Sequence, residues 1–210
     1  MIVNKKLYIF KRKHDTKIHK NRQRIKRDKI LNKECKENKS SCVNLKVFST
    51  NAAGLANGKL ESFYKVIDKL KPNIICLQET HFRKKGRLRM TNYNVFESIR
   101  TNKGGGTLVA CHKNLNPKLI NEYSENFELI TIEIKTSVKK IRIVCGYGPQ
   151  ENWPEIKRIP FFIALEAEIE KSKCIGIPVI IQMDANAKLG QEIIPGDPHK
   201  ISQNGILLKI

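Results

Sequence analysis

Long apolar runs are missing from this sequence. The longest apolar stretch, from Ile175 to Met183, is interrupted by Gly176, Pro178 and Gln182, whereas a transmembrane helix needs about 20 consecutive apolar residues. The N-terminus turns basic within a few residues and has no apolar segment typical of a secretion signal. We therefore expect neither a membrane span nor a signal peptide.

Acidic residues and histidines are also scarce. The 210 residues include 20 Asp and Glu against 40 Lys and Arg, for a formal net charge of +20, and only 5 His. Such a surplus of positive charge favours a polyanionic partner, most often nucleic acid. The alternative is a basic protein whose charge serves solubility alone.

The positive charge is densest in residues 1–44. This segment is rich in Lys, Arg and Asn and has no sustained apolar period, so we expect a basic, disordered tail. It is a candidate nucleic-acid arm or nuclear-import segment, and a solvated leader without a role is the alternative.

The cysteines indicate a reducing environment. Six are scattered along the chain, and Cys76, Cys111 and Cys145 lie inside apolar runs, as reduced core cysteines do. An intracellular location is therefore expected, and the basic tail favours the nucleus.

Residues 45–210 carry the periodicities of a folded domain with mixed α and β structure. Helical spacing of apolar residues predicts helices over 59–70 and 155–171. Strand-like runs separated by turn signals predict strands over 45–49, 73–79, 93–99, 106–112, 129–135, 140–147 and 177–183. We expect the last of these strands to be buried, and a hairpin to cross Thr136 to Lys139.

Three of these runs end on polar side chains: Asn51 follows the first, Glu79 the second, and Asp184 and Asn186 the last. Polar residues at strand ends lie along one rim of a sheet, where several can converge. Carboxylate and amide oxygens with few histidines suit a hard cation such as Mg²⁺. For each residue alone, the alternative is a turn residue or a helix cap.

Four short motifs occur in a fixed order: NAAGL from Asn51, LQETH from Leu77, GYGP from Gly146 and MDANAKLG from Met183. The series resembles the endonuclease/exonuclease/phosphatase superfamily, which includes deoxyribonuclease I, and most of all the endonuclease domains of non-LTR retrotransposons. The resemblance runs from about Leu45 to the last residue. It implies an α+β fold in which a two-sheet β-sandwich is flanked by helices, in four layers α-β-β-α.

The resemblance also implies roles for the residues of these motifs. Glu79 matches the ligand of a catalytic Mg²⁺, with Mn²⁺ as the alternative, and Asn51 matches an amide beside the metal. Tyr147 matches the tyrosine that contacts the scissile phosphate. Asp184 matches the residue that handles the attacking water, and Asn186 the amide that binds a phosphate oxygen.

Two departures from the family pattern affect the expected activity. Ala53 stands where family members usually carry an acidic residue, and no Asp-His pair follows near the C-terminus. His199 comes too soon after Asp184 to match that histidine. We therefore expect a domain that lacks its C-terminal part and has weakened or no activity. A longer parent protein with a reverse transcriptase is one expected context.

A basic loop follows Glu79, and its residues are candidates for binding DNA phosphates on either side of a cut; they are Arg83, Lys84, Lys85, Arg87 and Arg89. A solvated loop is the alternative. His81 is predicted either to face the site or to serve a local turn, and His112 is the other candidate histidine. Gly104 to Gly106 is predicted to be a bend entering a strand, because no P-loop lysine follows.

The sequence thus predicts Mg²⁺-dependent hydrolysis of phosphodiester bonds in DNA. Two alternatives stay open at this point. One is a phosphatase of the same superfamily that acts on a small phosphoester, and the other is an inactive module that only binds nucleic acid.

Overall fold

The computed structural model describes residues 44–55, 58–100, 104–123, 127–190, 194–195 and 199–208. The predicted basic tail lies outside these residues except for Asn44. Within the described part of the chain, no helix is long and apolar enough to cross a membrane.

Among the described residues, eight strands form two sheets of four. The first sheet has the order β1-β2-β4-β3, and its strands are β1 (Val47–Asn51), β2 (Ile74–Gln78), β3 (Tyr93–Ser98) and β4 (Thr107–His112). The second has the order β5-β6-β7-β8, and its strands are β5 (Lys118–Tyr123), β6 (Glu128–Lys135), β7 (Lys140–Tyr147) and β8 (Val179–Asp184). In each sheet one pair is parallel, β1 with β2 and β7 with β8, and the other pairs are antiparallel.

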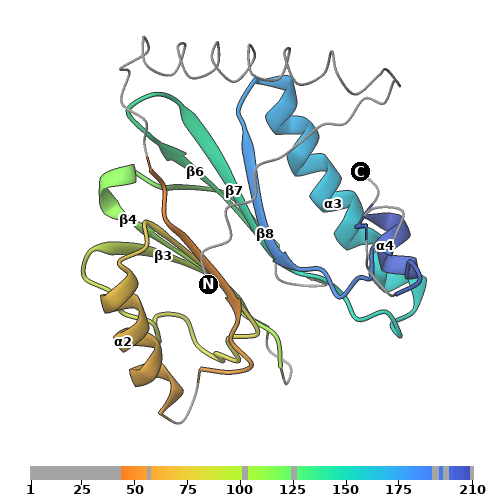
Figure 1. The fold of residues 1–210 in the computed structure, drawn as a ribbon, viewed down its shortest axis with the longest axis horizontal. Helices are drawn as coiled ribbons and strands as arrows, with labels where there is room; N and C mark the ends of the chain where they lie inside the picture. Colours follow the sequence, from red (N-terminus) through yellow and green to blue (C-terminus); the bar gives the residue numbers. More distant parts are fainter. Residues whose placement is uncertain are drawn as a thin grey trace, which may run out of the picture. The chain divides into compact units, whose positions relative to one another are not determined.

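Two long helices cover the outer faces of the sandwich (Figure 1). Helix α2 (Lys59–Leu70) packs on the first sheet and α3 (Glu155–Cys174) on the second. A short 3₁₀ helix, η1 (Lys113–Leu115), follows β4, and α4 (Gln203–Leu207) lies beside α3. The predicted four-layer α-β-β-α sandwich is confirmed.

Alternation along the strands produces three packed layers of apolar side chains. In β2, Ile74 and Cys76 face the second sheet, whereas Ile75 and Leu77 face α2, and all four are fully buried. Because both faces of β2 are covered, the strand is apolar at successive positions. Cys76, Cys111 and Cys145 are buried free thiols, as predicted.

Most predicted boundaries agree with the structure to within two or three residues. Helix α2 ends at Leu70 because Lys71 adopts a left-handed conformation and Pro72 follows. The predicted hairpin between β6 and β7 is confirmed: the Thr136 hydroxyl donates to the Lys139 carbonyl at 2.7 Å and accepts from two backbone N–H groups.

Two expectations differ from the structure. Strand β8 was expected to be buried, but it is the edge of its sheet, and Ile181 is 37% exposed. An apolar run alone does not reveal which strand has no neighbour. Strand β5 was not predicted, because its sequence KLINEY alternates poorly and its pairing with β6 shifts register between Leu119 and Asn121.

Candidate active site

The two parallel strand pairs bring the predicted residues to one rim of the sandwich. Asn51 pairs with Gln78, so Glu79 follows directly beside Asn51. Tyr147 pairs with Asp184 at the ends of β7 and β8. Parallel strands end at the same edge of a sheet, and these two edges meet.

Asn51 joins the two sheets at this rim. Its Nδ2 donates to Glu79 Oε1 at 2.9 Å and to Asp184 Oδ2, also at 2.9 Å. Its Oδ1 accepts the backbone N–H of Ala53 at 2.9 Å, which fixes the orientation of the amide. The carboxylates of Glu79 and Asp184, which lie 105 positions apart in the sequence, therefore share one amide donor.

The backbone around Glu79 is bonded on both sides. The Glu79 carbonyl accepts from Gly54 N–H at 2.7 Å, and Thr80 N–H donates to the Gly106 carbonyl at 2.9 Å. Glu79 itself has a φ of 51°, a conformation that is unfavourable for residues other than glycine. The neighbouring bonds hold the carboxylate in this orientation.

Positive φ values cluster at the same rim. Ala53, Glu79, His81 and Asn186 have φ values between 44° and 56°, and they are four of six non-glycine residues with positive φ in the described part of the chain. Backbone strain of this kind costs roughly 1–3 kcal/mol per residue and concentrates at functional sites. The cluster therefore supports a functional role for this rim.

Tyr147 links Glu79 to the second sheet. Glu79, Asn186 and Gln150 are the polar side chains that influence the pKa of its hydroxyl. Burial and the bond to Glu79 raise the pKa of Tyr147, so the hydroxyl stays protonated and donates. Burial raises the pKa of Glu79, but hydrogen bonds from Tyr147 and Asn51, with the nearby His81, outweigh it, and the net pKa is lowered. Glu79 is thus held as a carboxylate.

Replacing Tyr147 by Phe is expected to raise the pKa of Glu79, because one of the bonds that favour the carboxylate is removed. A lowered pKa in the folded state stabilises the fold above the ordinary pKa, and this contribution is lost as pH falls through the folded value. The measurement is an NMR titration of the Glu side-chain carboxyl carbons in metal-free protein. Tyr93→Phe is the control, since its hydroxyl bonds the Pro72 carbonyl; an unshifted Glu79 titration in Tyr147→Phe contradicts the prediction.

The loops after β7 and β8 touch each other closely. Gly148 N–H donates to the Asp184 carbonyl at 2.7 Å, and Asn186 Nδ2 donates to the Gly148 carbonyl at 2.8 Å. Asp184 Oδ1 accepts from Asn186 N–H at 3.1 Å. A Cβ on Gly148 would lie 2.6 Å from the Ala185 carbonyl oxygen, so only glycine allows this approach.

Asn204 of α4 anchors both loops, and no feature of the sequence had indicated this residue. Asn204 is fully buried and donates to the carbonyls of Pro149 at 2.8 Å and Asn186 at 3.0 Å. Its Oδ1 accepts from Arg158 Nη1 at 2.9 Å. The local signal was weak, because one Asn in a short helix reveals nothing of its distant partners.

The two candidate histidines lie at opposite ends of the first sheet. His81 Nε2 lies 3.5 Å from Glu79 Oε2, so His81 faces the site. His112 ends β4 beside the start of β2, where its ring packs against Tyr93 and its Nδ1 lies 2.8 Å from Asn114 Oδ1. His112 is therefore not part of this cluster.

A buried glutamate supports the glycine bend next to the site. Gly104, Gly105 and Gly106 all have positive φ and lead into β4, as predicted. Glu128 Oε2 accepts from Gly106 N–H at 2.7 Å, and its Oε1 lies 2.8 Å from Arg100 Nε. Burial raises the pKa of Glu128, against the opposing charge of Arg100.

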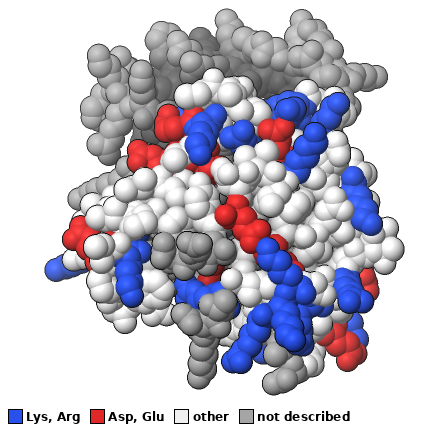
Figure 2. All heavy atoms as spheres, turned by 180° about the vertical axis from the view of Figure 1, so that it is seen from behind, with Lys and Arg blue, Asp and Glu red and all other residues white. Residues whose placement is uncertain are grey.

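The predicted basic loop is anchored by its apolar residues. Phe82 and Leu88 are buried against α2, and Gly86 N–H donates to Glu97 Oε2 at 2.6 Å. The five basic residues between and beside these anchors are exposed, and Lys85 pairs with Glu122 at 2.9 Å. On the face seen in Figure 2, basic side chains occur in several groups with acidic side chains among them.

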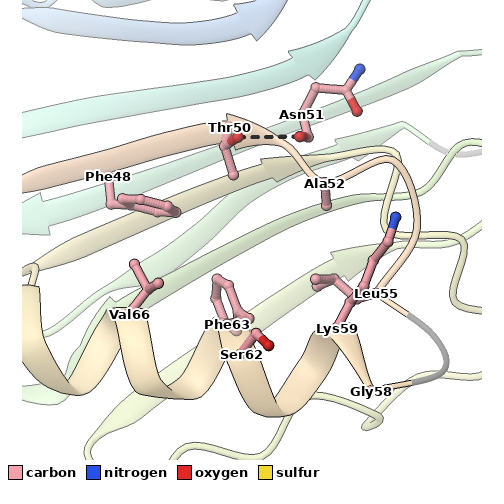
Figure 3. A pocket seen from close by; sticks show the side chains of 10 residues that line it. All are labelled: Phe48, Thr50, Asn51, Ala52, Leu55, Gly58, Lys59, Ser62, Phe63 and Val66. Carbon is pink, nitrogen blue, oxygen red and sulfur yellow. Dashed lines mark hydrogen bonds between the residues drawn. The ribbon is translucent and has the colours of Figure 1, made fainter. Parts of the chain in front are cut away.

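A hollow of about 520 Å³ lies between β1 and α2. Phe48 of β1 and Phe63 and Val66 of α2 line it, whereas the amide of Asn51 points away from the helix (Figure 3). The hollow is mainly apolar and adjoins the carboxylate cluster only at Asn51 and Ala52, so it does not contain the polar groups described above.

The donor set at the rim fits a hard divalent cation. Glu79 and Asp184 present oxygens around one point, and Mg²⁺ is usually bound by one or two carboxylates and several waters. Among the described residues, no group of three or more His, Cys, Asp and Glu side chains is placed to hold a metal. Asn51 now turns its nitrogen to the carboxylates; ligation through Oδ1 requires the amide to rotate.

Comparison with known structures identifies the fold. The chain is similar to the human Nocturnin catalytic domain with bound sulfate (21% identity over 71% of this chain and 66% of that one, TM-score 0.55). It is also similar to D. rerio TDP2 complexed with single-strand DNA product (17%, 71% and 63%, 0.51) and to the 3′ phosphatase NExo from Neisseria bound to product DNA hairpin (16%, 70% and 60%, 0.50). No protein-family model and no curated protein sequence matches the chain.

These three structures belong to the endonuclease/exonuclease/phosphatase superfamily, and the chain has their fold. It spans less than two thirds of the length of each. At identities this low, the likeness concerns the fold. The activity of this chain has to be argued from its own residues.

Proposed function

We propose that residues 45–210 form a metal-dependent endonuclease domain that hydrolyses phosphodiester bonds in DNA. The observation that carries this proposal is the amide of Asn51 bound to Glu79 and to Asp184, which joins the ends of two sheets. The order of the four motifs and the superfamily fold support the same function.

The proposed roles are those that the resemblance implies for these residues, and the geometry is compatible with them. Asp184 is a carboxylate at the rim, where it accepts a proton from the attacking water. The bond from Asn186 Nδ2 to the Gly148 carbonyl holds this amide at the rim, where we propose that it binds a phosphate oxygen. The protonated hydroxyl of Tyr147 is a further donor beside Glu79. His81, 3.5 Å from Glu79, is the histidine of the site.

A divalent cation held by Glu79, with Asn51 and Asp184 nearby, would supply positive charge to the phosphate and the leaving oxygen. We propose Mg²⁺, with Mn²⁺ as the alternative, because the donors are oxygens. The assignment to the retrotransposon branch rests on the motif series. The nuclear location and a reverse transcriptase in a longer parent protein stay predictions.

Relaxation of supercoiled plasmid tests the proposal. Nicked circles are expected with Mg²⁺ or Mn²⁺ and none with EDTA, and Asp184→Asn protein purified in the same way reveals any contaminating nuclease. Intact plasmid together with phosphate release from a small phosphoester favours the phosphatase alternative. Binding of DNA without cutting favours an inactive binding module.

Removing one basic side chain from the loop is expected to weaken DNA binding equally for all sequences. If Arg87 contacts a phosphate, Arg87→Ala lowers the slope of log affinity against log salt by about 0.9. The measurement is fluorescence anisotropy of labelled duplex DNA in EDTA at several salt concentrations. Lys69→Ala, an exposed charge in the last turn of α2, is the control; equal slopes for both variants place the loop outside the DNA interface.

A further inference from the structure

The one tryptophan of the chain, Trp153, lies in the turn between β7 and α3. Its backbone N–H donates to the Gln150 carbonyl at 3.0 Å, and its backbone carbonyl accepts from Arg158 Nε at 2.9 Å. The ring is only partly buried, and the neighbouring Ile156 is 81% exposed. A rigid turn therefore presents an aromatic ring at the surface.

The guanidinium of Arg100 lies over this ring. Its Cζ lies 5.3 Å from the centre of the Trp153 ring, within the range of a cation–π contact. Its Nε is held 2.8 Å from Glu128 Oε1, a carboxylate whose side chain is 1% exposed. Arg100 is thus fixed by a buried partner, and its guanidinium is stacked over one face of the indole.

Two independent contacts place this surface beside the candidate active site. The Gln150 carbonyl accepts from the backbone N–H of Trp153, and the Gln150 side chain is among the groups that influence the pKa of the Tyr147 hydroxyl. Glu128, which holds Arg100, pairs with Tyr147 across β6 and β7. Arg100 and Trp153 are therefore each connected to Tyr147, the proposed phosphate contact, through one intervening residue.

We infer that Trp153 and Arg100 form a stacking subsite for a nucleobase next to the phosphate that is cut. This inference rests on the proposed function and narrows its substrate. A base inside a duplex has no free face, so the nucleotide beside the cut has to be unpaired. Stacking accepts any base, because every base has a π-face. The subsite therefore selects unpaired nucleotides over paired ones and does not select a particular base sequence.

The alternative is a purely structural pair, in which Arg100 neutralises Glu128 and Trp153 covers the start of α3. Trp153→Leu separates the two readings, since leucine keeps an apolar side chain in the turn and loses the aromatic face. Ile156→Ala is the matched control on the same surface. If Trp153→Leu unfolds at a lower temperature than Ile156→Ala, Trp153→Phe takes its place in the binding assay. A smaller loss of affinity for single-stranded DNA is then expected.

The test uses the full chain in EDTA, so that binding is measured without cleavage. A short oligothymidylate is expected to quench the fluorescence of Trp153, and a blunt duplex of equal length is expected to quench it less. By anisotropy, Trp153→Leu is expected to bind the single strand about 5- to 150-fold more weakly, with no matching loss for the duplex and none in Ile156→Ala.

The outcomes separate this inference from the proposed function. Quenching and a selective loss in Trp153→Leu support the subsite even if plasmid is never nicked. Absence of quenching, or equal losses in Trp153→Leu and Ile156→Ala, overturns the subsite, whereas metal-dependent nicking in the same preparation leaves the proposed function intact.

Discussion

Replacing Asp184 by Asn is expected to lower the rate of plasmid nicking by about 10² to 10⁴. Asparagine has nearly the same shape, and its one oxygen keeps either the bond from Asn51 or the bond from Asn186 N–H. It cannot accept a proton from water, and it removes one negative charge from the rim. The change therefore acts on the chemistry and spares most of the packing.

The measurement is the initial rate of conversion of supercoiled to nicked plasmid at saturating Mg²⁺. Asp68→Asn is the matched control, because Asp68 is an exposed carboxylate on α2, away from the rim, and its rate is expected to equal that of the parent protein. Thermal unfolding should show both variants folded. A rate for Asp184→Asn within a factor of a few of the parent would exclude Asp184 from proton transfer.

Replacing Asn204 by Ala is expected to destabilise the protein by about 3 kcal/mol, because two buried groups and one partly buried group lose their partner and a buried group left without one costs about 1–3 kcal/mol. These groups are the carbonyls of Pro149 and Asn186 and the guanidinium of Arg158. Arg158 is 4% exposed and bonds neutral oxygens of Trp153, Gln203 and Asn204. Each of these acceptors therefore helps to stabilise the buried positive charge of Arg158.

Urea unfolding followed by circular dichroism measures this loss. Gln203→Ala is the control, since Gln203 accepts from the same arginine at 2.6 Å but is exposed and does not hold the two loops; a loss within about 1 kcal/mol is expected there. Nicking should fall with stability in Asn204→Ala, because the loops that carry Tyr147 and Asn186 lose a shared anchor. Equal stability of the two variants would rule out the proposed anchoring.

The regular elements of the fold could be predicted because their signals are local. Alternation along β2 and the 3.6-residue spacing along α2 are visible in any window of the sequence. Strand β5 escaped prediction because a bulged edge strand carries polar residues on both sides. The exposure of β8 was not predicted either, because an edge strand differs from a central strand only in lacking a neighbouring strand on one side.

The residues of the candidate site likewise include some with local sequence signals and some without. The structure places together five residues that lie at or just after strand ends in recognisable motifs: Asn51, Glu79, Tyr147, Asp184 and Asn186. The catalytic and metal-binding roles assigned to them stay predictions. Glu128, Arg100 and Asn204 carry no motif, since each acts through partners that are distant in the sequence.

By itself, the sequence determined which strands end on polar side chains, where the two long helices run and how strongly basic the chain is. Only the tertiary structure decided that Asn51 of one sheet contacts Asp184 of the other, 133 positions away, and that His81 rather than His112 faces Glu79. The physical reason is that the periodicity of apolar side chains depends only on residues that are close together in the sequence. The meeting of two sheet edges depends instead on how apolar faces far apart in the sequence pack against each other.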